Sequence, residues 1–292
     1  MTRHEYRRVD VFTRHRFGGN PLAVFPDARA VDPALMQRIA FELNLSETTF
    51  VLPSSRPDCD VRVRIFTPRR EIPMAGHPTV GTAFVLDRGD RIVFEEGVGP
   101  VPVERVRAPD GSLLWRMTQP RPRFGPRFED RAAVAIALGL DAADLDPALP
   151  LECVATGHPF LCVPLASLDA LARAQIRPDR WDPIERQLRE ALPYLFVRTG
   201  PAAARCRMFA PNEGIPEDPA TGSAAGPLGA YWLAQGLAAR DADGIARLTF
   251  AQGVELGRPS ELQVEVEGEG PEITAVRVAG ACVAVGGGWF EL

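Results

Sequence analysis

Two short loops, at 74–82 and 217–225, contain the residues best suited to chemistry. Their sequences, MAGHPTVGT and EDPATGSAA, each place glycine and small polar residues just before an apolar stretch. If each stretch is helical, each loop supplies a helix start, whose free N–H groups and positive dipole end bind anions. Two such starts facing one cleft would suit a small carboxylate ligand. The alternative is ordinary helix capping by Thr79 and Ser223.

Each loop also contains an ionisable group. His77 lies in the first loop and is the strongest catalytic candidate among the four histidines of the chain. Asp218 lies in the second loop, where it is suited equally to direct chemistry and to capping a helix. A third acid, Glu47, falls between a predicted helix and a predicted strand. Its spacing alone indicates a solvated surface residue.

The loops belong to a longer internal repeat. Residues 64–73 (RIFTPRREIP) and 207–216 (RMFAPNEGIP) share the pattern R-x-F-x-P-x-x-x-I-P, at an offset of 207 − 64 = 143. Upstream of each copy, residues 19–25 (GNPLAVF) and 157–163 (GHPFLCV) form a second pair, at an offset of 157 − 19 = 138. Two ordered pairs indicate a duplication. Equivalent loops should then meet at the axis that relates the two copies.

The duplication predicts an α/β (α+β) protein with two pseudo-symmetric halves, at 1–118 and 128–292. The proline-rich stretch 118–128 reads as a linker. The last strand can belong to either half, because it can return to the N-terminal half. The elements leading to the loops also have local signals, because Asp32-Pro33 suits a helix start and an apolar face then continues to about Asn44.

Helices are also expected at 80–89 and 222–236, directly after the two loops. Both segments are rich in apolar and small residues.

Composition excludes several classes of function. The chain has 292 residues and a formal net charge of −5, so it offers no basic surface for nucleic acid. It contains no run of 18 apolar residues, which argues against a membrane span. The N-terminal segment has no apolar core typical of a secretory signal. A cytoplasmic location is therefore expected.

The residues that are missing exclude cofactor classes. All 33 basic residues are arginine, so the chain has no lysine for a pyridoxal-phosphate Schiff base or for a phosphate-binding P-loop. The five cysteines form no C-x-x-C pair and indicate no zinc site. We therefore expect neither a metal nor an organic cofactor.

The ordered motifs resemble the PhzF-like family of phenazine biosynthesis isomerases, which are relatives of diaminopimelate epimerase. The resemblance covers nearly the whole chain and rests on the segments VDVFT, GGNPLAVF, ELNLSETTFVLP, RIFTPRREIPMAGHPTVGTA, TGHPF, RMFAPNEGIPEDPATGSAAGPLGAYW, QGVELGRPSEL and VAVGGG. It implies two halves that each wrap a rolled sheet around a central helix, with the site between them. It also implies a homodimer and a cofactor-independent isomerase.

The resemblance assigns roles to residues in and near the loops. It implies that Glu47 is the carboxylate that shuttles a proton, on a substrate similar to trans-2,3-dihydro-3-hydroxyanthranilate. The polar side chains that it implies around the substrate are those of His77, Asp218 and Ser223. The positions whose backbone it implies for holding the substrate carboxylate are Gly76, Thr221 and Gly222. Met74 stands where relatives often have Phe, which affects the shape of the pocket.

Two alternatives remain on the same fold. The related epimerases use one cysteine in each loop, but this chain has Ala75 and Pro219 at those places. Because neither side chain can transfer a proton, two-thiol epimerisation or racemisation is disfavoured. The other alternative is a non-catalytic protein that binds small acids. The joint presence of Glu47, His77, Asp218 and Ser223 argues against it.

Overall fold

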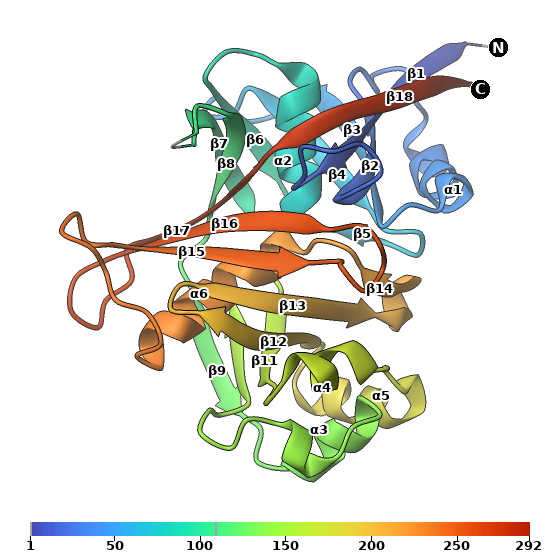
Figure 1. The fold of residues 1–292 in the computed structure, drawn as a ribbon. Helices are drawn as coiled ribbons and strands as arrows, with labels where there is room; N and C mark the ends of the chain where they lie inside the picture. Colours follow the sequence, from blue (N-terminus) through green and yellow to red (C-terminus); the bar gives the residue numbers. More distant parts are fainter. Residues whose placement is uncertain (1, 109) are drawn as a thin grey trace.

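The computed structural model describes residues 2–108 and 110–292, which form a mixed α/β fold of two similar halves (Figure 1). The elements of the first half are β1 (Arg3–Val11), β2 (Asn20–Phe25), α1 (Pro33–Leu43), β3 (Glu47–Pro53), β4 (Val61–Phe66), β5 (Glu71–Ile72), α2 (Gly76–Leu86), β6 (Arg91–Glu96), β7 (Gly99–Arg107) and β8 (Leu113–Gln119).

The second half has the larger share of the helices. Its elements are β9 (Arg123–Arg127), α3 (Arg131–Ala137), β10 (Glu152–Ala155), β11 (Pro159–Pro164), α4 (Leu168–Arg173), α5 (Pro178–Gln187), β12 (Leu192–Gly200), β13 (Ala203–Ala210), β14 (Ile215–Asp218), α6 (Gly222–Ala234), β15 (Ile245–Gln252), β16 (Ser260–Glu267) and β17 (Ala275–Gly280). The last strand is β18 (Cys282–Glu291), and two short 3₁₀ helices lie at Ala142–Asp144 and Pro211–Glu213.

Each half wraps its strands around one central helix, α2 in the first half and α6 in the second (Figure 1). Both helices are apolar on all sides, as expected of helices surrounded by protein. α2 packs against β1, β2 and β8, and α6 packs against β10, β16 and β17. α2 begins at Gly76, earlier than the expected helix at 80–89, whereas α6 begins at the expected residue 222.

The local signals at α1 are confirmed. The Asp32 carboxylate accepts a hydrogen bond from the Ala34 N–H at 2.9 Å, and Pro33 is the first helical residue. Asn44 ends the helix in the left-handed conformation, with φ 48°. The helix therefore stops just before β3, which begins at Glu47.

The stretch 118–128 is not an irregular linker, because much of it is strand. β8 continues to Gln119, and β9 (Arg123–Arg127) pairs antiparallel with β10. All five residues of β9 are exposed, so the sequence lacks the apolar alternation that marks a half-buried strand. Its proline is tolerated because β9 lies at the edge of the sheet.

Strand pairing joins the two halves into one sheet. β8 of the first half pairs antiparallel with β17 of the second. The last strand, β18, pairs with β1, so the two ends of the chain lie side by side (Figure 1). The halves are therefore fixed to each other by backbone hydrogen bonds in two places.

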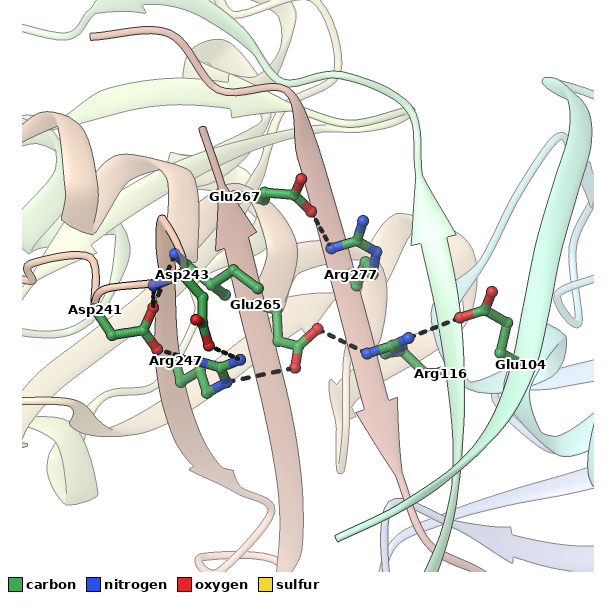
Figure 2. A network of polar contacts seen from close by, with 9 residues as sticks. Glu104, Arg116, Asp241, Asp243, Arg247, Glu265, Glu267 and Arg277 are labelled. Atoms are coloured by element: carbon green, nitrogen blue, oxygen red, sulfur yellow. Dashed lines mark hydrogen bonds and ion pairs between the residues drawn. The ribbon is translucent and has the colours of Figure 1, made fainter. Parts of the chain in front are cut away.

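A network of ion pairs crosses the outer face of this junction (Figure 2). The Arg116 guanidinium, on β8, contacts Glu104 on β7 at 2.7 Å and Glu265 on β16 at 3.0 Å. Glu265 also contacts Arg247 on β15 at 3.8 Å. The network thus links strands of both halves.

The largest apolar core surrounds the two central helices and spans both halves. Smaller cores lie under α1 and beneath the helices α3 to α5. Within residues 2–108 and 110–292, no helix combines the length and the apolar character needed to cross a membrane.

Candidate active site

The two central helices begin at the same place, where the halves face each other. A Cβ atom added to Gly76, the first residue of α2, would lie 2.4 Å from the backbone N of Ser223 and 2.5 Å from the Cα of Gly222. Only a glycine allows the two backbones to approach this closely. The convergence of the helix starts follows from the repeat.

Neither helix start is capped by a side chain among the described residues. Ala75 is the N-cap residue of α2 and cannot cap it, and the Thr221 side chain does not cap α6. The alternative interpretation, capping by Thr79 and Ser223, is therefore wrong. The Thr79 hydroxyl contacts the Ala75 carbonyl oxygen and Glu96 instead. Uncapped starts leave backbone N–H groups for an anion.

A cavity of about 190 Å³ lies in front of the two helix starts. The seven predicted site residues all line it, namely Glu47, Gly76, His77, Asp218, Thr221, Gly222 and Ser223. The structure thus places predicted residues from both halves of the chain around one cavity. Their chemical roles remain predictions.

Glu47 is buried, so the surface position indicated by its spacing alone is wrong. It is the first residue of β3, and its Oε2 atom lies 3.3 Å from His77 Nε2. The geometry does not form a hydrogen bond, and both atoms lack a hydrogen-bond partner among the described residues. Burial without donors disfavours the ionised form of an acid.

The electrostatics of the pair follow from burial. Burial, with the nearby charges of Asp218 and Glu213, raises the pKa of Glu47 well above its ordinary value. Burial lowers the pKa of His77 to about 3, so this imidazole is neutral at pH 7. The pair at neutral pH is thus an uncharged histidine beside a carboxyl group that is able to hold a proton.

Asp218 is also buried, but it is surrounded by donors. The Thr221 hydroxyl donates to its Oδ2 at 2.6 Å, and the Asn20 amide donates to its Oδ1 at 2.7 Å. Burial raises the pKa of Asp218 to about 6, and these hydrogen bonds, with one from Ser46, limit the rise. Its bonding partners are side chains, so Asp218 is not the N-cap of α6.

Sequence reasoning missed the residues that support Asp218. The Gln252 side chain donates to the backbone oxygen of Asp218 at 2.7 Å and accepts from the Thr221 N–H at 3.1 Å. Tyr194 donates its hydroxyl hydrogen to Gln252 at 3.0 Å. The signal for Asn20 and Gln252 was present, since they lie in the GGNPLAVF and QGVELGRPSEL motifs, but nothing in the sequence marked Tyr194.

The rest of the cavity wall is apolar with a charged rim. Met74 is buried and lines the cavity, where its sulfur would lie 3.0 Å from a Cβ added to Gly157. At the rim, Arg70 of the first half donates from Nε to Glu213 of the second half at 2.8 Å. His158, the counterpart of Asn20 in the repeat, lines the cavity as well.

Two features bear on the alternative chemistries. Ala75 forms part of the cavity wall, and none of the five cysteines does, so no thiol is placed to transfer a proton there. The ligand atoms of Glu47, His77 and Asp218 lie within 4.8 Å of one another, a spacing that a divalent cation can use. Both oxygens of Asp218, however, already accept hydrogen bonds. The absence of a metal stays a prediction.

Known proteins resemble the chain over its full length. The family model described as "Phenazine biosynthesis-like protein" matches residues 9–288. A trans-2,3-dihydro-3-hydroxyanthranilate isomerase of Pseudomonas aeruginosa is 39% identical over 95% of each chain. An uncharacterized isomerase of Mesorhizobium japonicum is 37% identical over 99% of each chain.

The fold of the chain is also similar to that of a solved structure from this family. The phenazine biosynthesis protein of the PhzF family from Bacillus anthracis superposes with a TM-score of 0.89, at 28% identity and over 100% of each chain. The converging helix starts and the buried acids are thus found in a chain whose sequence and fold both match one family. The chain belongs to the phenazine biosynthesis-like (PhzF) family and is an enzyme of the isomerase class.

Proposed function

We propose that the protein is a cofactor-independent isomerase that moves a proton between two carbons of a small unsaturated carboxylic acid, with Glu47 as the acid and base. The observation that carries the proposal is the placement of Glu47. It is a buried carboxyl group whose Oε2 atom has no hydrogen-bond partner among the described residues, and it lies beside the neutral His77 in the cavity where two uncapped helices begin. The naming of relatives as trans-2,3-dihydro-3-hydroxyanthranilate isomerases makes that acid the first substrate to test.

Binding would use the helix starts. The backbone N–H groups of Gly76, His77, Gly222 and Ser223 are suited to the substrate carboxylate, because each helix start favours an anion by roughly 0.3–1 kcal/mol when exposed and more when buried. This explains how an acid is held in a cavity that no lysine reaches. The small cavity, about 190 Å³, favours a single ring or a short chain.

The proton transfer would use the raised pKa of Glu47. In its carboxylate form Glu47 takes a proton from one carbon, and the electron pair left behind spreads into the adjacent double bond and the carboxyl group. The protonated Glu47 then returns the proton to the other end of this conjugated system, so no atom or electron is gained or lost. A carboxylate whose pKa is raised toward neutrality is a stronger base for this step.

Asp218 and His77 would orient the substrate rather than act as the main base. The hydrogen bonds from Thr221 and Asn20 stabilise the ionised form of Asp218, which suits an acceptor for a substrate hydroxyl or amino group. His77 is neutral, so it offers a hydrogen bond without a positive charge.

The test is turnover of trans-2,3-dihydro-3-hydroxyanthranilate, and then of related unsaturated acids, in deuterated water with mass spectrometry of the product. One group that removes and returns the same proton should leave a fraction of the product without deuterium. The epimerase alternative predicts a different result, since two opposed bases place solvent deuterium on the carbon that lost its proton. A non-catalytic binding protein would give no exchange with any acid in the panel.

We also propose that the protein is a homodimer, on the basis of the family alone. Light scattering at micromolar concentration should give about twice the chain mass of 31.8 kDa. A mass equal to that of one chain would contradict this proposal.

A further inference from the structure

A third buried acid, Glu96, lies behind the start of α2, where the proposed mechanism does not use it. It is the last residue of β6 and is 5% exposed. The next residue, Gly97, is packed so closely on the loop before α2 that an added Cβ would lie 2.7 Å from the Cα of Pro73. The end of β6 therefore packs directly against the loop that leads into the helix start.

Hydrogen-bond geometry defines the protonation state of Glu96. The Thr79 hydroxyl oxygen lies 2.6 Å from the Ala75 carbonyl oxygen and 2.6 Å from Glu96 Oε1. A hydroxyl group has one proton to donate, and the Ala75 carbonyl can only accept. Two such short contacts need two protons. The second proton must therefore belong to Glu96, which donates to Thr79 while Thr79 donates to Ala75.

The surroundings of Glu96 agree with a neutral acid. Burial raises its pKa to about 8, and a hydrogen bond that Thr79 can donate to the ionised carboxylate opposes only part of this rise. Its Oε2 atom has no hydrogen-bond partner among the described residues. No charged side chain among the described residues contributes to the shift of the Glu96 pKa.

The charged groups on the neighbouring elements are engaged elsewhere. On α2, His77 faces Glu47, and on β4, Arg64 pairs with Glu71. Arg62 of β4 is exposed and lies in register with Glu95, which binds Ser54 and Ser55. The charged residues of β7 lie beyond Gly99, the residue that pairs with Glu96.

We propose that Glu96 is a positioning residue, kept as a neutral carboxylic acid, that acts through Thr79 and Ala75 to fix the first turn of α2 and so the anion site at Gly76 and His77. The proposal rests on the proposed function in one respect, that this helix start binds the substrate anion. Ionisation of Glu96 would turn the Thr79 hydroxyl toward it and release the Ala75 carbonyl. It would also place a negative charge behind the site that must receive an anion.

The first experiment needs no ligand. Protein labelled with ¹³C at the glutamate side-chain carboxyl carbon and with ¹⁵N on the backbone is titrated by NMR from pH 5 to pH 9. The Glu96 carboxyl signal is identified by its loss in Glu96→Gln, whose amide N–H₂ can donate to Thr79 as the protonated acid does. We expect this signal to titrate near pH 8, with the Gly76 and His77 amide signals following it in the wild type and not in Glu96→Gln.

Two results of that titration would overturn the proposal. One is a Glu96 carboxyl signal that is already close to its ionised position at pH 5, as expected of a group with the ordinary pKa of 4.5. The other is that the chemical shifts of the Gly76 and His77 amides do not change as Glu96 titrates. Glu265→Gln, at the outer junction, is the matched control and should leave both amide signals unchanged.

The second experiment measures the anion site with 4-fluorobenzoate as the probe, by ¹⁹F NMR. Thr79→Val keeps the shape of the side chain but removes the hydroxyl, and should weaken probe binding by roughly 10-fold, as for the loss of one buried hydrogen bond. Thr79→Ser keeps the hydroxyl and should bind nearly as the wild type does. Equal binding by Thr79→Val and Thr79→Ser would refute a role for this hydrogen-bond chain.

The pH dependence of probe binding separates positioning from simple support. In the wild type, affinity should fall between pH 7 and pH 9, and in Glu96→Gln it should fall less, because Glu47, whose pKa is also raised, still lies in the cavity. A fall of the same size in both proteins would contradict the role of Glu96. Failure of the wild type to bind 4-fluorobenzoate at all would count against the anion site of the proposed function, and the ligand-free titration would then decide the case for Glu96.

Discussion

The two halves meet at an outer junction and at an inner cavity, and polar groups are treated differently in the two places. At the junction, each charged side chain labelled in Figure 2 contacts an opposite charge, and water still reaches the pair of Arg116 (26% exposed) and Glu104 (38% exposed). In the cavity, His77 is 3% exposed, and its Nε2 and the Oε2 of Glu47 lack hydrogen-bond partners within the described residues.

The junction holds the two halves together, whereas the cavity holds the groups suited to chemistry. Exposed ion pairs contribute typically 0–1 kcal/mol each, so the junction is held mainly by the backbone pairing of β8 and β17, and its charges can be changed at small cost. Buried polar groups without partners are costly, and their pKa values shift strongly. The cavity is therefore where the fold gives up stability for reactive groups.

The sharpest test makes the same chemical change in both regions. Glu47→Gln in the cavity keeps the shape of the side chain but cannot carry a proton, and turnover of a verified substrate should fall roughly 10²–10⁴-fold. Glu265→Gln at the junction should leave turnover unchanged and cost about 1 kcal/mol or less. Turnover and urea unfolding of both variants check this. Near-wild-type turnover by Glu47→Gln would remove it as the acid and base.

The stability of the cavity region should depend on pH through Glu96. Its pKa of about 8 in the folded protein exceeds the ordinary 4.5 of the unfolded chain. Folding therefore retains a proton that the unfolded chain releases, and the stability present below pH 4.5 is lost as the pH rises toward 8.

Glu96→Gln does not ionise, so its stability relative to the wild type should increase across this window by up to about 1.4 kcal/mol per pH unit. Urea unfolding of both proteins at pH 5, 6.5 and 8 measures the difference. Glu265→Gln should show no such trend with pH. A constant difference between Glu96→Gln and the wild type would show that Glu96 is ionised in the folded protein.

A smaller loss is expected for Asp218→Asn. The variant keeps the buried shape but removes the charge that accepts hydrogen bonds from Thr221 and Asn20. Because hydrogen bonds to charged groups contribute about 1.5–3 kcal/mol, activity should fall roughly 10- to 100-fold. Steady-state kinetics and thermal unfolding are measured together. If the loss of activity is explained entirely by unfolding, Asp218 has only a structural role.

The sequence predicted the parts of the site that depend on local patterns. The duplicated loops at 74–82 and 217–225 indicated two helix starts in one cleft, and the close approach of Gly76 to Gly222 agrees. The Asp32-Pro33 signal placed the start of α1. Such features could be predicted because chain geometry over a few residues determines them.

The parts that were missed depend on long-range packing. Glu47 looks solvated from its neighbours, and it is buried because the other half of the chain closes over the start of β3. Glu96, in RIVFEEGVG, looks like a charged strand end, yet Thr79 and Ala75 enclose it. The strand β9 is exposed throughout, so its sequence has no alternation of apolar and polar residues to indicate a strand. Burial of a polar side chain is a property of the assembled fold.

The smallest expected effect is that of removing metal ions. Glu47, His77 and Asp218 are close enough to bind a divalent cation, which would give a partner to the unpaired Oε2 of Glu47 and Nε2 of His77. We expect no such ion to be needed, because binding would require an ionised Glu47 and a free lone pair on Asp218. Burial opposes the first, and the hydrogen bonds from Thr221 and Asn20 oppose the second.

Exhaustive dialysis against a chelator should therefore leave turnover and thermal stability unchanged, for the wild type and for the junction variant Glu265→Gln alike. Loss of turnover that zinc, manganese or magnesium restores would make the cavity a metal site, and Oε2 of Glu47 and Nε2 of His77 would then be metal ligands rather than a proton-transfer pair.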